Sequence, residues 1–204
     1  IIQEAIKKNK QIIFDYMKWN NHKQLVRKNI EGKYSINPWT LIWANDRYYL
    51  YGYDTFEKDG VRKERHYRVD KLDNIEIMET DRQGKELFMH FNADTYVAKR
   101  MGMYTDQERR IKVRIPESLV GTFIDQFGKW IDIKEAICQQ DIESADNEHN
   151  EKVEGKKLVV TFCAVKSNVL LGWLIGLGNV EVLEPEDVKE KMIALLDKDK
   201  DYYK

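Results

Sequence analysis

Residues 37–54, NPWTLIWANDRYYLYGYD, decide how the first half of this 204-residue chain folds. An Asn-Asp pair at 45–46 marks a tight turn between two runs rich in β-branched and aromatic residues, a composition typical of strands. Because side chains alternate along a strand, Leu50 lies on one face of the second run and Tyr49 and Tyr51 on the other. We expect Leu50 in the core and both tyrosines on the outer face.

Other segments around this stretch carry helix or strand patterns. They are a helix at 1–9 and strands at 11–18, 25–31, 62–69 and 75–78. Short strands in this number must curl round to bury a core and to hide their edges. We therefore predict an α+β chain whose first domain, residues 1–79, is a small Sm-like or SH3-like β-barrel.

In the second half of the chain, strand patterns are interspersed with helix patterns. Strands are predicted at 110–115, 130–137, 157–165 and 180–183, and helices at 116–127, 168–178 and 185–197. The order β-α-β-β-α-β-α begins with the ferredoxin-like split βαβ pattern. We predict a ferredoxin-like βαββαβ domain over 109–204, joined by a helical linker over 80–108 whose one helix runs from 93 to 101. A polar, acidic loop is expected at 139–155.

Composition indicates a folded globular protein, with 42% hydrophobic and 34% charged residues. No apolar run approaches the roughly 20 residues of a membrane helix, and the first residues lack the apolar core of a signal peptide. The two cysteines, Cys138 and Cys163, form no CxxC pair. A disulfide framework or a zinc site is therefore not expected. We expect a cytoplasmic protein with no membrane partner and no cofactor.

Catalytic motifs are absent from the sequence. The histidines at 22, 66, 90 and 149 are scattered, without the spacing of a metal site. The glycine cluster at 172–178, GWLIGLG, lies in and after an apolar helix, which suits helix packing and not phosphate binding. We therefore predict no enzyme activity, no catalytic residues and no metal ligands.

Charge is distributed unevenly along the chain. Residues 1–72 carry a net charge of +6 and residues 73–204 a net charge of −7, which together give the −1 of the whole chain. A basic first half favours an anionic partner. The alternative is that lysine-rich surfaces only keep a small domain in solution.

Aromatic and basic residues are interleaved in residues 34–72, which hold six of the eleven tyrosines. Bases stack on aromatic rings and guanidinium groups hold phosphates, so this mixture suits nucleic acid. The structural alternative is that these rings fill a thin barrel core. On the strand at 62–69, alternation pairs Tyr67 with Val69 as core residues and directs His66 and Arg68 outward.

At this point the residues resemble a known family, the WYL domain. Its pattern is a Pro-led strand, a Trp/Tyr-Tyr-Leu triplet, a Gly-Tyr/His-Asp end and an aromatic-Arg-hydrophobic-Asp-Arg-hydrophobic segment. The matching residues are Pro38, Tyr48-Tyr49-Leu50 and residues 67–72, YRVDKL. Tyr48 replaces a more frequent tryptophan, and Lys71 replaces the second arginine. Downstream, FIDQFG at 123–128 and LLGWLIGLGNVEVLEP at 170–185 resemble the WCX extension of the same regulators.

The resemblance implies an Sm-fold barrel that binds an effector, in some members single-stranded DNA or another nucleic-acid species. The WCX part is implied to support dimerisation. Such domains usually follow an N-terminal helix-turn-helix that binds DNA. The chain begins at Ile1 within an amphipathic helix, and we expect a fragment of a transcriptional regulator that lacks this upstream part.

We predict that the barrel senses a nucleotide or single-stranded nucleic acid, with Arg68 as the main anion anchor, Tyr49 as a stacking surface and His66 as a neighbour. Further ligand-binding candidates are Arg47, Arg65, Lys71 and Tyr51. The apolar segments 157–165 and 169–177 lead us to expect a homodimer through the C-terminal part.

Two other functions compete with this prediction. One is a dimerisation and scaffold module without a small ligand, which an Arg68 sealed in an ion pair with Asp70 or Glu64 would favour. The other is an RNA-recognition module, because that fold is also ferredoxin-like. The strand KKLVVTFCAV lacks the aromatic signature of such modules, which argues against it.

Overall fold

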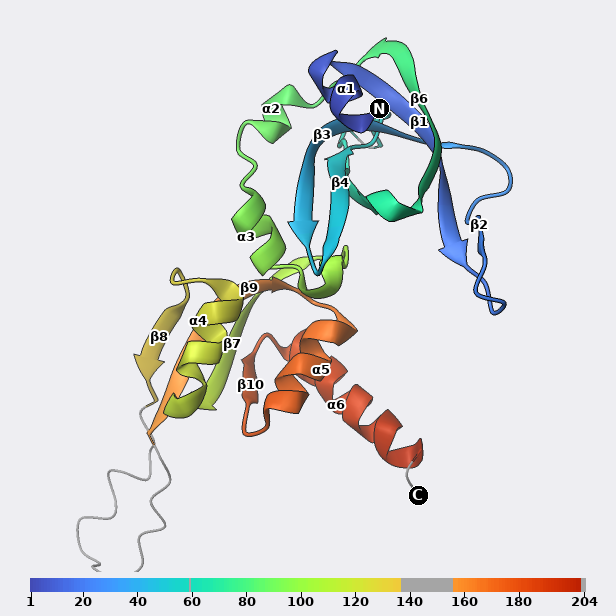
Figure 1. Cartoon of the computed structure of the whole chain (residues 1–204). Helices are drawn as coiled ribbons and strands as arrows, with labels where there is room; N and C mark the ends of the chain where they lie inside the picture. Colours follow the sequence, from blue (N-terminus) through green and yellow to red (C-terminus); the bar gives the residue numbers. More distant parts are fainter. Residues whose placement is uncertain (59, 137–155, 203–204) are drawn as a thin grey trace, which may run out of the picture. The chain divides into compact units, whose positions relative to one another are not determined.

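The computed structural model describes residues 1–58, 60–136 and 156–202 (Figure 1). The chain divides into two compact units, Ile1–Ala93 and Asp94–Lys204. Both units are mixed α+β, and all of their paired strands are antiparallel. Cys138 and the acidic loop predicted at 139–155 lie outside the described residues.

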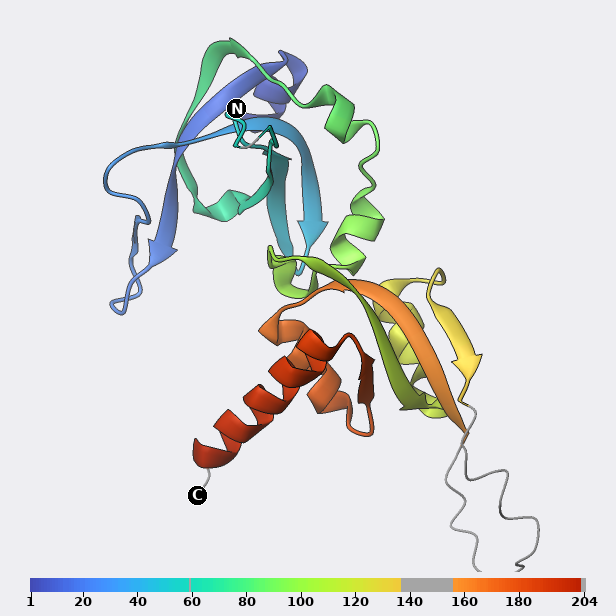
Figure 2. The same cartoon turned by 180° about the vertical axis from the view of Figure 1, so that it is seen from behind.

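The first unit is built on one curled sheet, which bends back on itself in both views (Figures 1 and 2). Its strands run in the order β2-β1-β3-β4-β5, and β6 pairs with β1 as well. The elements are α1 (Ile2–Lys7), β1 (Lys10–Trp19), β2 (Leu25–Arg27), β3 (Tyr34–Ala44), β4 (Arg47–Tyr53), β5 (Glu64–Arg68), η1 (Val69–Lys71), β6 (Leu72–Asp81) and α2 (Lys85–Phe88).

Strand β1 joins the two sides of this curled sheet. Ile12 pairs with Ile36 of β3 and also with Ile77 of β6. Ile12 and Ile36 are fully buried with Phe14 and Leu50, and Ile2 and Ala5 of α1 cover the same cluster. Tyr67 and Val69 pack against it. The predicted core positions of Leu50, Tyr67 and Val69 are therefore confirmed.

The side-chain amide of Asn37 ties this sheet together at one end. Its Nδ2 donates to the backbone oxygens of Tyr53 (3.3 Å) and Asp54 (2.8 Å). Its Oδ1 accepts from Gln11 Nε2 (3.0 Å) and from the backbone N–H of Gln83 (2.8 Å). A fully buried polar group is tolerated when all its hydrogen bonds are made, and Asn37 meets that condition.

Gly52 allows strands β3 and β4 to approach closely beside this amide. It lies opposite Pro38, next to a register shift in the β3–β4 pairing. A Cβ atom at position 52 would overlap the backbone carbonyl of Asn37. The glycine of the Gly-Tyr-Asp motif is therefore required by a backbone contact.

The second unit has a four-stranded sheet in the order β10-β7-β9-β8. The predicted order of strands and helices over 109–204 is observed. The elements are α3 (Ala93–Ala98), η2 (Met101–Met103), β7 (Glu108–Pro116), η3 (Glu117–Leu119), α4 (Val120–Phe127), β8 (Asp132–Glu135), β9 (Lys157–Val165), α5 (Asn168–Leu177), β10 (Glu181–Glu184) and α6 (Glu186–Tyr202).

Alternation along β7 gives its sheet one apolar and one polar face. Ile111, Val113 and Ile115 are buried against α4 and α5, whereas the intervening residues Arg110, Lys112 and Arg114 remain at least partly exposed. Seen from behind, β7 and β9 lie in front of α4 (Figure 2). Most of the apolar surface of 157–165 and 169–177, on which the homodimer prediction rests, is used in this internal core.

The linker departs from the single helix predicted at 93–101. The observed helix α3 ends at Ala98, and a 3-10 turn, η2, follows it. Gly102 inside η2 has φ 66°, which a continuous α-helix does not permit. An additional short helix, α2, lies at Lys85–Phe88, where no helix was predicted.

We predict that Gly52→Ala lowers the free energy of unfolding by more than about 2 kcal/mol, because the added methyl must displace backbone. Urea unfolding followed by circular dichroism measures the change. Gly32→Ala is the matched control, since a Cβ atom at position 32 meets no atom within 4 Å. Equal urea midpoints of unfolding for the two variants would contradict the close approach of Gly52 to the backbone of Asn37.

Candidate functional site

Strands β4 and β5 bring five of the seven predicted site residues onto one face of the sheet. Tyr49 pairs directly with Arg68, and Tyr51 pairs with His66. The ring of His66 also meets that of Tyr49 edge-on, with centroids 5.9 Å apart. Arg47 shares the face of Tyr49 by alternation. We call these five residues, Arg47, Tyr49, Tyr51, His66 and Arg68, the Arg68 face.

Tyr49 and Tyr51 project to the predicted side, opposite Leu50, but they are not solvent-facing. Their exposed fractions are only 7% and 2%. Phe91 stacks on Tyr51 with ring centroids 4.1 Å apart, so residues that follow the curled sheet in sequence cover part of this face. The prediction that both rings lie on an open outer surface is therefore wrong.

Arg68 is held by Asp70, two residues further along the chain. Its Nε and Nη2 donate to the two carboxylate oxygens of Asp70 at 3.0 and 2.7 Å. These hydrogen bonds, together with the positive charge of Arg68, hold the pKa of Asp70 below its ordinary value. The backbone N–H of Arg68 donates to the hydroxyl of Tyr16 at 3.3 Å, which fixes the end of β5.

The Arg68–Asp70 pair is not sealed from solvent. The Arg68 side chain is 28% exposed and that of Asp70 is 50% exposed. Of the five guanidinium N–H groups, the three that Asp70 does not engage make no hydrogen bond to a described residue. Arg47 also lies near this carboxylate, with its Nε 4.0 Å from Asp70 Oδ2. The face therefore offers free donors on a preoriented guanidinium.

Arg65 and Lys71 are placed differently from the other candidates. Arg65 shares the face of Tyr67, and its Nε and Nη2 donate to the two carboxylate oxygens of Asp54 at 2.7 and 2.8 Å. The Asp54 side chain is only 9% exposed. Lys71 closes the 3-10 turn η1 after β5. The structure therefore does not bring Arg65 to the Arg68 face.

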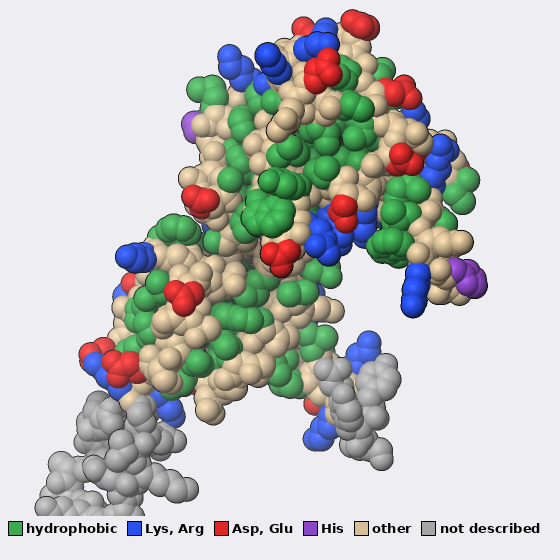
Figure 3. Space-filling view, viewed as in Figure 1, with side chains coloured by type: hydrophobic (Ala, Val, Ile, Leu, Met, Phe, Trp, Pro, Cys, Tyr) green, Lys and Arg blue, Asp and Glu red, His purple; other side chains and the backbone are tan. Residues whose placement is uncertain are grey.

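Ion pairs offset much of the positive charge predicted for the first unit. Lys and Arg side chains are mixed with Asp and Glu on the face of that unit shown in Figure 3. Pairs within the first unit join Lys10 to Asp81, Arg27 to Asp15, Lys33 to Glu76 and Arg62 to Glu57. An anionic ligand would therefore meet individual basic side chains, not a uniformly basic surface.

The described part of the chain shows neither a metal-binding cluster nor a membrane-spanning helix. No group of three His, Cys, Asp or Glu side chains there could hold a metal ion. None of the described helices combines the length and the apolar character needed to cross a membrane.

Sequence reasoning missed two residues that shape the Arg68 face. Tyr16 lies 52 residues before Arg68 in the chain, and no spacing rule links these positions. Phe91 belongs to a linker that was predicted only as helical. The aromatic residues of that linker were the available signal that it covers apolar surface.

Comparison with known families identifies the class of this protein. The WYL domain family matches residues 1–77, and the WCX domain family matches residues 107–198. The chain therefore contains a WYL domain followed by a WCX domain, as the sequence resemblance predicted. No curated protein matches the sequence.

A solved structure similar to this chain is that of proteasome accessory factor B/C (PafBC) of Arthrobacter aurescens. The TM-score is 0.38 and the sequence identity 15%. The match covers 96% of this chain and 25% of that one, so the present chain spans about a quarter of the length of its neighbour.

We predict that Arg65→Ala is destabilising, because it leaves the carboxylate of Asp54 without its bidentate partner. We expect a loss of about 1–2 kcal/mol, less than for a fully buried pair, since Arg65 is partly solvated. Thermal unfolding measures the change, with Lys63→Ala as an exposed control on the same segment. An Arg65→Ala variant as stable as the control would show that the ion pair is not structural.

Proposed function

We propose that this chain is the effector-binding and dimerisation part of a bacterial transcriptional regulator, and that it is not an enzyme. The single observation that carries the proposal is the preoriented, incompletely used guanidinium of Arg68 on an aromatic-lined strand pair. The WYL and WCX assignments support a regulator's sensing part in general. Its DNA contact would come from a helix-turn-helix outside this sequence.

The proposed effector is a nucleotide or single-stranded nucleic acid. An arginine offers two parallel donors to one phosphate, and Arg47 and Lys71 would add charge around it. Tyr49 and His66 would supply the walls of the site. Because Tyr49 is buried in this structure, its role as a stacking surface requires that the face open when the effector binds.

Asp70 would control how readily an effector phosphate reaches Arg68. Its carboxylate occupies two donors of Arg68 and lies beside Arg47. A phosphate must share or replace it, so Asp70 both orients the guanidinium and competes with the effector. The competing scaffold function assigns the same pair a purely structural role.

We also propose the finer fold assignments. An antiparallel sheet that curls behind an N-terminal helix supports an Sm-like barrel in the WYL domain. The strand order β10-β7-β9-β8, with α4 and α5 against the same core, supports a ferredoxin-like WCX domain.

We predict that Arg68→Ala weakens binding of a short single-stranded oligothymidylate by about 1.5–3 kcal/mol, the range for a hydrogen bond to a charged group. Arg68→Lys should recover part of that loss. The melting temperature should change little, because a surface ion pair contributes little to folding. Fluorescence anisotropy and thermal unfolding on the same samples measure both quantities. A large drop in melting temperature with unchanged affinity would establish the scaffold function instead.

The matched variant Asp70→Asn sharpens this test. It removes the competing charge and keeps the shape of the side chain, so the free energy of oligonucleotide binding should become more favourable by about 1 kcal/mol or less.

Binding of the oligonucleotide through about three basic residues should weaken with salt, and the logarithm of the binding constant should fall against the logarithm of the salt concentration with a slope near −2. A slope near zero would point to an uncharged effector.

We propose that the chain forms a homodimer through the second unit. Most of the apolar surface of α5 is internal, but Ile193 and Leu196 of α6 remain exposed and share one helix face. Sedimentation should find twice the 24.3 kDa of one chain. Ile193→Glu with Leu196→Glu should give monomers, whereas Lys198→Glu should not. A monomeric wild-type chain at tens of micromolar would contradict the dimer.

A further inference from the structure

A cavity of about 330 Å³ lies beside strand β9 in the second unit, within the size range of small-molecule sites. Strand β8 pairs with β9 only between Leu158 and Thr161. The cavity lies next to the following residues of β9, which β8 does not cover. A second hollow of about 420 Å³ shares three residues with it, namely Arg110, Asp132 and Thr161.

One side of the cavity is aromatic. Phe127 and Phe162 are buried and stacked, with ring centroids 4.2 Å apart, and they form its floor. Trp130 is 62% exposed. It lies against Gly128, which has φ 85° and where a Cβ atom would overlap the ring. An exposed tryptophan ring therefore lies at the edge of the cavity.

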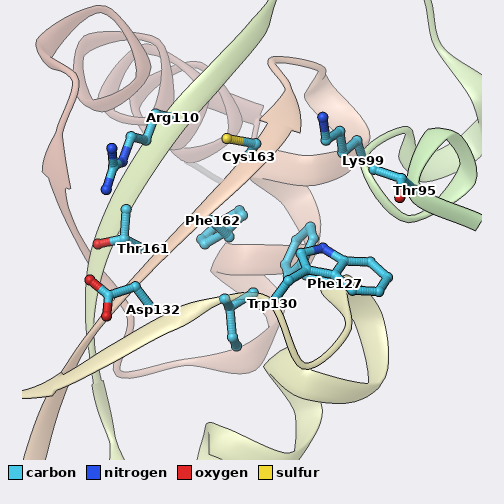
Figure 4. Close-up of a pocket in the computed structure, with 10 residues that line it drawn as sticks. Thr95, Lys99, Arg110, Phe127, Trp130, Asp132, Thr161, Phe162 and Cys163 are labelled. Carbon is cyan, nitrogen blue, oxygen red and sulfur yellow. The ribbon is translucent and has the colours of Figure 1, made fainter. Parts of the chain in front are cut away.

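The other side of the cavity is polar. Figure 4 shows Arg110, Thr161 and Asp132 gathered opposite the rings of Trp130 and Phe127. The strand register supports this arrangement, because Arg110 lies opposite Cys163 and Asp132 lies opposite Thr161. A cation and an anion therefore flank one hydroxyl group.

Arg110 differs from the basic residues that follow it on the same face of β7. Lys112 pairs with Glu184 at 2.8 Å, and Arg114 pairs with Glu181. Arg110 makes neither a hydrogen bond nor an ion pair with any residue in the described ranges. Its guanidinium is therefore available to a carboxylate.

Asp132 is only loosely engaged. Its one ion pair with a described residue is to Lys134 at 3.3 Å, and the Lys134 side chain is 73% exposed. Such a surface pair is weak and easily exchanged. The carboxylate is therefore available to a ligand ammonium group.

We propose that this cavity binds a free amino acid with an aromatic side chain. Arg110 would hold its carboxylate, Asp132 its ammonium group and the Thr161 hydroxyl either of them, while the ring packs between Trp130 and Phe127. Asp132 would repel a purely anionic ligand, and Arg110 would repel a purely cationic one. This site goes beyond the proposed nucleic-acid sensing, since it lies in the other unit and selects a zwitterion.

Calorimetry on the whole chain tests the proposal with L-phenylalanine, phenylacetate, phenethylamine and glycine. L-phenylalanine should bind most tightly, because the other three each lack one of its groups. Arg110→Gln should weaken the binding of L-phenylalanine about tenfold, whereas phenethylamine, which has no carboxylate and is repelled by Arg110, should bind at least as tightly as before. Asp132→Asn should weaken the binding of L-phenylalanine similarly, whereas phenylacetate, which has no ammonium group and is repelled by Asp132, should bind at least as tightly as before. Lys129→Gln and Asp125→Asn are the charge-matched controls outside the cavity. Phenylacetate binding as tightly as L-phenylalanine, or no binding of L-phenylalanine, would overturn the proposal.

A second readout locates the ligand. Cys163 is an exposed free thiol that lines the cavity, so bound L-phenylalanine should slow its alkylation by iodoacetamide, measured on the Cys163 peptide by mass spectrometry. Trp130→Leu should abolish most of this protection. Arg68→Ala should leave it intact, which separates a failure here from a failure of the proposed nucleic-acid site. Unchanged alkylation at saturating L-phenylalanine would overturn the assignment.

Discussion

The buried side-chain amide of Asn37 is the interaction on which the first unit depends. Its four hydrogen bonds join β1, the end of β4 and Gln83, the second residue after β6. A polar group so deeply buried tolerates no unpaired partner, so these segments must meet in one register. That register sets Gly52 against β3, and through β4 it sets Arg68 opposite Tyr49. The candidate site is thus a consequence of an amide that takes no part in it.

Side-chain alternation made much of this unit predictable from sequence. Leu50, Tyr67 and Val69 lie in the core because a strand has only two faces and one must be apolar. The burial of Tyr49 and Tyr51 could not be predicted in the same way, because the Phe91 ring on Tyr51 comes from the linker. The Arg65–Asp54 pair was missed for a similar reason: it joins residues 11 apart across a turn. Alternation assigns a face but does not say what covers it.

The order of strands and helices in the second unit also followed from its sequence, since each helix begins or ends at a recognisable residue. Ser167 caps α5 by accepting from the backbone N–H of Leu170, and Gly128 ends α4. The cavity beside β9 was beyond this reasoning. Arg110 and Asp132 are 22 positions apart in sequence, and only the pairing of β7 and β8 with β9 places both beside Thr161.

The pairing of β1 with β6 has a consequence for how the chain acquires its structure during synthesis. Lys10 contacts Asp81 across 71 positions of sequence, and β1 is the strand from which the curled sheet is built on both sides. Contacts this far apart slow folding, because a long loop must close before they form. On the ribosome, residues 10–16 of β1 would lack their β6 partners until β6 emerges. The first unit therefore completes its sheet late, as nearly its last residues leave the exit tunnel.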